Sequence, residues 1–139
     1  MGGNKVGVET PTVFVIDDEE PVRAGLARLL NAIGVTSVTF DSAESFLNAY
    51  EPELEGCLLV DIRMPGMSGL DLIEELNRRK SSLPAIVMTG HAESRAMERL
   101  RTLNTMGFLQ KPFRVSELKE VLGRWWSTTD RGEPPWPTG

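Results

Sequence analysis

Acidic, hydroxyl and basic side chains follow four of the apolar runs in this sequence. They are Asp17 and Asp18 after 12–16, Asp61 near the end of 57–62, Thr89 after 83–88 and Lys111 after 107–110. Carboxylates that crowd together repel one another, and a hard divalent cation relieves that repulsion. Oxygen ligands without a histidine or cysteine cluster favour Mg²⁺, or the similar Mn²⁺, over zinc or copper. A lysine and a hydroxyl could hold an anionic tetrahedral group, so the combination predicts phosphoryl transfer to an aspartate.

These side chains can meet only if the runs that carry them share one sheet. Five apolar runs of strand length alternate with five stretches of helical periodicity. The expected strands are 12–16, 35–40, 57–62, 83–88 and 107–110. Strands buried on both faces and separated by helices are typical of parallel sheets. The sequence therefore predicts an α/β fold, a doubly wound five-stranded parallel sheet with five helices, whose strand carboxyl ends share one edge.

Short polar residues mark where three of the helices should begin. Asp41 or Ser42 is expected to cap the second helix, Ser68 to start the third and Ser116 to cap the last. Such side chains accept hydrogen bonds from the free N–H groups of a first helical turn.

The composition fits one cytoplasmic domain. The chain has 139 residues, a formal charge of -5, one cysteine and one histidine. The acidic charge argues against nucleic acid as a direct partner, because phosphate backbones bind basic patches. Cys57 cannot form an internal disulfide and suits a reducing cytosol. No run has the length of a membrane helix and the N-terminus lacks signal-peptide features, so we expect no membrane contact.

The two ends of the chain differ in composition from the rest. Residues 1–11 are polar and Gly-rich and are expected to form a flexible arm before a domain at 12–126. Residues 127–139 include three prolines in the stretch 133–137 and are expected to form a linker or a frayed end, because proline cannot continue a helix. Trp126 is expected to be an exposed ring, a dimer contact or, preferably, partly buried under this tail.

Three motifs occur in order along the chain. They are Val60-Asp61-Ile62-Arg63-Met64-Pro65-Gly66-Met67-Ser68-Gly69, then Met88-Thr89-Gly90-His91, then Lys111-Pro112-Phe113. With these motifs, the chain from about 12 to 126 resembles the receiver domain of two-component response regulators, a CheY-like variant of the flavodoxin-like architecture. Within that family it is most similar to the receivers of nitrogen-fixation-type regulators.

The resemblance implies a role for each acidic residue at the predicted edge. Asp61 matches the phosphoacceptor, which takes a phosphoryl group from a phosphohistidine of a sensor histidine kinase. Asp18 matches the residue that binds Mg²⁺ directly, and Asp17 matches its neighbour, which acts through metal-bound water. Asp61 and the backbone carbonyl of Arg63 complete the implied ligands. Such a domain assists its own phosphorylation and dephosphorylation and turns over no separate substrate.

The same resemblance implies the switch residues. Thr89 matches the hydroxyl that is drawn to the phosphoryl group, and Lys111 matches the lysine that pairs with it, with a candidate cis peptide bond after Lys111. Phe108 stands where the family has an aromatic switch. Arg63 and His91 match the flanking positions that tune phosphate lifetime.

The implied output surface comprises the fourth helix, fifth strand and fifth helix. It would contact a downstream protein or an attached output domain, with a phosphorylation-dependent homodimer as a further option. The chain departs from the family at 103–107, where Asn104 stands in place of a small Ala-Gly-Ala turn. Partner choice is therefore where this chain is expected to differ.

Alternative functions follow from the same residues. The chain could be a complete single-domain regulator or the receiver fragment of a DNA-binding transcriptional regulator. A flavodoxin-like FMN carrier shares the architecture, but acidic 17–20 would repel a phosphate. A phosphatase with an aspartate nucleophile would need a second aspartate two residues after Asp61, where this chain has Arg63. Asp17 and Asp18 could also simply cap the first helix.

Overall fold

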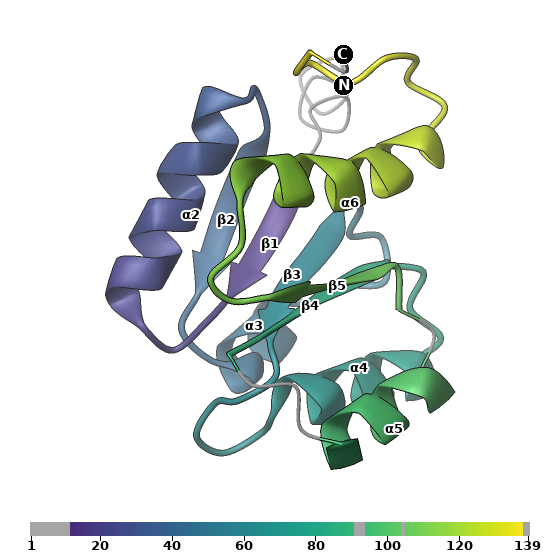
Figure 1. The fold of residues 1–139 in the computed structure, drawn as a ribbon. Helices are drawn as coiled ribbons and strands as arrows, with labels where there is room; N and C mark the ends of the chain where they lie inside the picture. The colour runs from purple at the N-terminus through teal and green to yellow at the C-terminus, as the bar shows by residue number, and fades with distance from the viewer. Residues whose placement is uncertain (1–11, 91–93, 104, 138–139) are drawn as a thin grey trace.

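The apolar runs form one parallel sheet in the computed structural model, which describes residues 12–90, 94–103 and 105–137. The strands are β1 Thr12–Ile16, β2 Thr36–Phe40, β3 Cys57–Asp61, β4 Ala85–Thr89 and β5 Gly107–Gln110. The helices are α2 Glu20–Ala32, α3 Ala43–Ala49, α4 Gly69–Arg78, α5 Ser94–Thr102 and α6 Val115–Ser127. The strand order is β2-β1-β3-β4-β5, with every neighbouring pair parallel. The predicted doubly wound α/β fold is confirmed (Figure 1).

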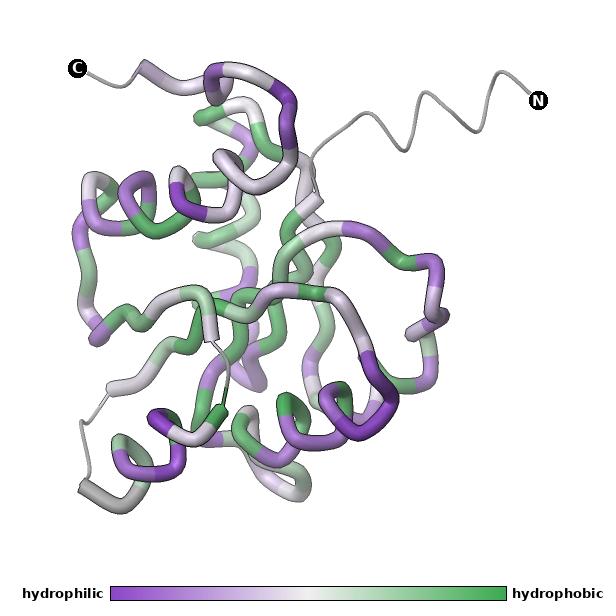
Figure 2. The backbone as a smooth tube through the Cα atoms, turned by 90° about the vertical axis from the view of Figure 1, so that its right-hand side faces the viewer, coloured by the Kyte–Doolittle hydropathy of each residue, from purple (hydrophilic) through white to green (hydrophobic). Residues whose placement is uncertain are grey.

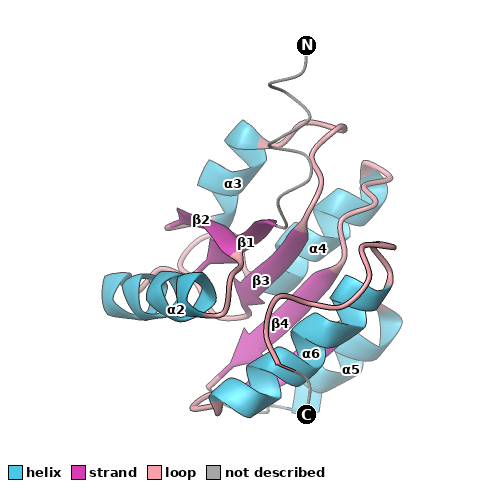
Figure 3. Ribbon diagram, turned by 90° about the horizontal axis from the view of Figure 1, so that it is seen from above, coloured by secondary structure: helices cyan, strands magenta, loops and turns pink. Residues whose placement is uncertain are grey.

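Helices cover both faces of the sheet. Val13 and Val15 of β1 join the buried cluster of α2 and α6, whereas Phe14 and Ile16 join that of α3, α4 and α5. This division follows from the two-residue period of a strand, which turns alternate side chains to opposite faces. Figure 3 shows α2 and α6 on one side of the sheet and α3 and α4 on the other. Figure 2 shows hydrophobic segments in the interior of the domain and hydrophilic segments mainly on its outside.

Helix starts agree with the predicted caps at two positions and differ at one. The hydroxyl oxygens of Ser42 and Ser68 accept hydrogen bonds from backbone N–H groups in the first turns of α3 and α4. The prediction that Ser116 caps the last helix is wrong, because α6 begins at Val115 with Arg114 as its N-cap residue. The Arg114 N–H donates to the Glu117 carboxylate at 2.7 Å, and this bond replaces the expected serine cap.

The described part of the tail, predicted to be a linker or a frayed end, packs against α6 and Gly34. Trp136 is only 4% exposed, and its ring lies edge-on to that of Trp126, with the centroids 5.9 Å apart. The Trp126 indole N–H donates to the Gly132 carbonyl at 3.0 Å, and Pro135 lies against Gly34. Prolines do end α6, but an extended segment can still bury an indole ring. Trp126 is thus buried under the tail.

Some of the predicted features cannot be placed in the structure. The arm at 1–11, His91 and Asn104 lie outside the described residues. Cys57 is buried, as expected of a small core residue, and burial raises the pKa of its thiol. Across the described ranges, no helix is long and apolar enough to cross a membrane.

Candidate functional site

The predicted polar residues meet at the carboxyl edge of the sheet because the strand register aligns their ends. The pairs at this edge are Ile16 with Val60, Asp61 with Met88 and Thr89 with Gln110. Asp17 therefore lies beside Asp61, and Thr89 and Lys111 follow on the next two strands. This is the edge at which doubly wound sheets bind ligands, and β1 and β3 flank the point where the strand order reverses.

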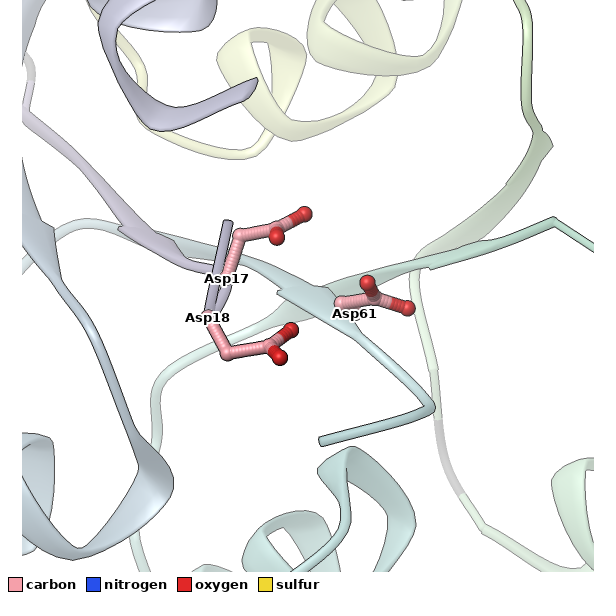
Figure 4. Close-up of side chains that lie close together, drawn as sticks. All are labelled: Asp17, Asp18 and Asp61. Atoms are coloured by element: carbon pink, nitrogen blue, oxygen red, sulfur yellow. The ribbon is translucent and has the colours of Figure 1, made fainter. Parts of the chain in front are cut away.

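Three carboxylates gather at this point. Single oxygens of Asp17, Asp18 and Asp61 all lie within 4.8 Å of one another. Figure 4 shows Asp17 and Asp18 extending from the end of β1 and Asp61 from the end of β3. Asp17 and Asp61 are buried, whereas Asp18 is exposed. The reading of Asp17 and Asp18 as a simple helix cap does not account for this convergence.

Lys111 ties the two buried carboxylates together. Its ammonium donates to Asp17 Oδ2 at 2.8 Å and to Asp61 Oδ2 at 3.0 Å. Its backbone N–H donates to the Thr89 carbonyl at 2.7 Å, and the peptide bond that follows is cis, as predicted. Two buried carboxylates therefore share one ammonium, and one negative charge is left over that a cation can neutralise.

The shared charges shift the protonation of both partners. Burial raises the pKa of Asp61 above its usual value, because ionised carboxylates lose hydration, although the hydrogen bond and charge of Lys111 act against this rise. Burial would lower the pKa of Lys111, but its hydrogen bonds to Asp17 and Asp61 outweigh that effect and raise it. Lys111 therefore keeps its proton, and ionisation of Asp61 requires more free energy than that of an exposed aspartate.

Backbone donors fix the direction of the two buried carboxylates. The Arg63 N–H donates to Asp61 Oδ1 at 3.1 Å, and the Glu19 N–H donates to Asp17 Oδ1 at 2.9 Å. Arg23, which the sequence reasoning missed, donates from Nη1 to the Asp17 carbonyl at 2.8 Å. Its position in the first turn of α2, six residues after Asp17, is the signal that could have identified it.

A glycine lets the chain turn tightly beside the phosphoacceptor candidate. The Gly69 N–H donates to the Ile62 carbonyl at 2.9 Å. A Cβ atom at Gly69 would collide with the backbone carbonyl oxygen of Asp61. The loop between β3 and α4 is also held by Glu44, whose carboxylate accepts the Met67 N–H at 3.0 Å. Sequence reasoning did not identify Glu44, since it lies far from this loop in the chain.

The other predicted site residues that the structure describes lie on β4, on β5 and in the loop after β3. Thr89 ends β4 and is 1% exposed. Phe108 lies within β5, half-buried against the cluster that includes α4 and α5. The Arg63 side chain is exposed, and His91 is outside the described residues. The structure therefore brings together Asp17, Asp18, Asp61 and Lys111, with Thr89 at the end of the neighbouring strand.

The donor set fits a hard divalent cation. Asp17, Asp18 and Asp61 offer only oxygen atoms, the ligands that Mg²⁺ prefers. The exposure of Asp18 leaves one side of the cluster open to the solvent water that Mg²⁺ retains.

Comparison with known proteins assigns the chain to a family. Residues 13–123 match the model of the response regulator receiver domain. This chain belongs to that family. The resemblance inferred from the motifs is thereby confirmed, and the match does not favour the FMN-carrier alternative.

Several characterised relatives share this domain. The transcriptional regulatory protein FixJ of Azorhizobium caulinodans is 41% identical over 120 residues, which cover 84% of this chain and 57% of that protein. The DNA-binding transcriptional regulator NtrC of Escherichia coli is 36% identical over 112 residues, or 81% of this chain and 24% of that protein. A crystal structure of FixJ-N has a TM-score of 0.77 and 38% identity, covering 84% of this chain and 93% of that one. The chain thus spans only part of the two regulators.

Proposed function

We propose that this receiver domain accepts a phosphoryl group on Asp61 from a phosphohistidine of a sensor histidine kinase. The convergence of the Asp61 carboxylate with Lys111, Asp17 and Asp18 at the carboxyl edge carries the proposal. An Asp61 oxygen would attack phosphorus as the bond from phosphorus to the histidine nitrogen breaks. The products are an acyl phosphate on Asp61 and a free imidazole on the kinase.

The neighbouring groups suit the charge that this reaction moves. Bound Mg²⁺ would neutralise phosphoryl oxygens, and Asp17, Asp18, Asp61 and the carbonyl of Arg63 would hold it. Lys111, which now donates to the Asp61 carboxylate, would donate to the phosphoryl group once Asp61 is esterified. The alignment of these groups before reaction lowers the cost of assembling them.

The response to phosphorylation would involve the residues beside this cluster. The Thr89 hydroxyl would bind a phosphoryl oxygen, and Phe108 would turn further inward. The side chains at 63 and 91 would set how readily water reaches the acyl phosphate. These movements would change the surface of α5, β5 and α6, and so the affinity for a partner protein, an attached output domain or a second copy.

The test is phosphorylation by a small phosphodonor in the presence of Mg²⁺, read by intact mass. Wild type should gain one acid-labile phosphoryl group, and Asp61→Asn should gain none. Asp41→Asn removes an exposed aspartate elsewhere and should behave as wild type. Chelation of Mg²⁺ should abolish the gain. An equal gain in wild type and Asp61→Asn would contradict the proposal.

A further inference from the structure

Helix α5, part of the proposed output surface, has little apolar anchorage. Among its described side chains, at 96–102, only Leu100 is buried, and Ala96 and Met97 are partly buried. The preceding helix α4, by contrast, buries five residues, which are Gly69, Leu70, Leu72, Ile73 and Leu76. Burial of apolar side chains is the main stabilising contribution to a surface helix. Because α5 has little of it, its position depends more on polar contacts with neighbouring elements.

An open groove separates α5 from the loop that follows Asp61. It is lined by Ile62, Met64 and Pro65 near the loop, by Leu70 of α4 and by Ala96 and Arg99 of α5, and has a volume of about 640 Å³. Side-chain packing therefore does not fill the space between the loop and the helix. A movement of α5 relative to the loop would meet little steric resistance on this side.

Arg99 crosses from α5 to α4 beside this groove. Its Nη2 lies 2.6 Å from Asp71 Oδ1 and 2.8 Å from Glu74 Oε1. Figure 1 shows α4 and α5 lying next to each other below the sheet. One guanidinium thus pairs with two carboxylates of the neighbouring helix, and the hydrogen bond from Arg99 lowers the pKa of Asp71.

Asp71 continues this connection toward the phosphoacceptor. Its Oδ2 accepts the Ser68 N–H at 3.2 Å, while Ser68 Oγ accepts the Asp71 N–H at 3.1 Å. Ser68 ends the loop that begins at Asp61 and precedes Gly69, whose N–H is bonded to the Ile62 carbonyl. Polar contacts therefore run without a break from Arg99 through Asp71 to the loop of Asp61.

We propose that Arg99 is a positioning residue that holds α5 in the arrangement in which Lys111 donates to the Asp61 carboxylate, and thereby restrains phosphorylation. This inference rests on the proposed function. Phosphorylation would break the bond between Lys111 and that carboxylate, so any contact made only in the present arrangement opposes it. Such a contact slows phosphoryl gain by a factor that grows exponentially with its free energy.

The expected effect is moderate because the pairs are partly exposed. The side chains of Arg99, Asp71 and Glu74 are 39%, 46% and 51% exposed. Partly exposed ion pairs are weak and are screened by salt. Arg99→Gln should therefore speed phosphoryl gain from a small phosphodonor by roughly threefold to fivefold at low salt.

The experiment compares initial rates of phosphoryl gain for four proteins at low and high salt. Arg99→Gln should be faster than wild type, with the difference shrinking in roughly 0.5 M NaCl. Arg101→Gln removes an exposed arginine of the same helix and should match wild type. Glu74→Gln removes one of the two carboxylate partners of Arg99 and should speed phosphoryl gain less than Arg99→Gln does. Asp71 is left unchanged because it also caps α4.

Two results separate this inference from the proposed function. If wild type is phosphorylated on Asp61 but Arg99→Gln reacts at the wild-type rate, the role of Arg99 is refuted and the proposed function stands. If wild type gains no phosphoryl group, the proposed function fails. Amide hydrogen exchange then tests whether Arg99 holds α5 in place. Faster exchange in α5 of Arg99→Gln supports this role, and unchanged exchange refutes it.

Discussion

The two edges of the sheet are built on opposite principles. At the carboxyl edge, Asp17 and Asp61 are buried and share one ammonium from Lys111. At the amino edge, Trp126 is buried beneath Trp136 of the tail, and Pro135 lies against Gly34, just before β2. Burial of charged groups lowers the free energy of unfolding, whereas burial of indole rings raises it. The edge that carries the chemistry therefore depends on stability generated elsewhere in the molecule.

The largest expected effect of losing a single side chain lies at the amino edge. Trp136→Ala should lower the free energy of unfolding by about 3 kcal/mol, since it removes a buried indole and uncovers Trp126. This is at the low end for such changes, because a segment without helix or strand can relax. Urea unfolding measures the loss, and phosphoryl gain on Asp61 should stay at the wild-type rate.

The matched control for Trp136 is Glu133→Gln, which alters an exposed side chain of the same tail. Its unfolding midpoint should equal that of wild type. Equal midpoints for Trp136→Ala and wild type would show that the tail contributes nothing to stability, and the contrast between the edges would disappear.

A second substitution should damage both stability and chemistry. Gly69→Ala would push a methyl group against the Asp61 carbonyl, so the backbone at the phosphoacceptor must move. We expect a loss of roughly 1–3 kcal/mol in the free energy of unfolding, together with slower phosphoryl gain. Urea unfolding and intact mass on the same sample measure the two effects.

Gly25→Ala serves as the comparison for Gly69→Ala. Gly25 lies within α2, and a Cβ atom there would meet nothing within 4 Å. Alanine should stabilise this helix by roughly 0.5–1 kcal/mol and leave phosphorylation unchanged. If both alanine variants behaved alike, the close approach of Gly69 to Asp61 would have no consequence.

The smallest expected effect is a gain in stability at the carboxyl edge. Asp61→Asn should slightly raise the free energy of unfolding at pH 7, because the raised pKa of Asp61 means that its ionised form destabilises the fold. A carboxyl group whose pKa is raised on folding lowers the free energy of unfolding at pH values above its pKa in the unfolded chain. Below that pKa it has no effect. The gain should therefore fade as the pH falls through the raised pKa of Asp61 and be absent below about 4.

Urea titrations of Asp61→Asn and wild type at pH 7 and pH 3 measure this dependence. Asp130→Asn, at an exposed position of the tail, provides the control and should show no such change between the two pH values. A loss of stability in Asp61→Asn at pH 7 would mean that the bond to Lys111 outweighs the cost of burial.

Much of the carboxyl edge could be predicted from the sequence. The two-residue and helical periods identify strands and helices, and parallel strands necessarily end on one edge, so Asp17, Asp61 and Lys111 had to converge. The shared hydrogen bonds of Lys111 could not be predicted in detail, because they depend on strand register. Helix boundaries depend on which of several nearby side chains bonds the backbone. At the start of α6, the Glu117 carboxylate accepts the Arg114 N–H, and Ser116 does not act as the cap.

The features that sequence reasoning missed are contacts between segments far apart in the chain. Arg99 meets Asp71 and Glu74 only because two helices lie at a particular angle, which no local pattern encodes. The tail was expected to be loose because its prolines signal only the end of a helix. The burial of Trp136 depends on the shape of the surface presented by α6 and Gly34.

The placement of the tryptophans has a spectroscopic consequence. All three in the sequence, Trp125, Trp126 and Trp136, belong to the one buried cluster, and two successive edge-on contacts link their rings. Intrinsic fluorescence therefore comes from the α6 side of the sheet and from the tail, and records their solvation. Circular dichroism records the helices and strands of the whole domain. An unfolding curve in which the fluorescence signal changes first would identify detachment of the tail as a separate step, without any added label.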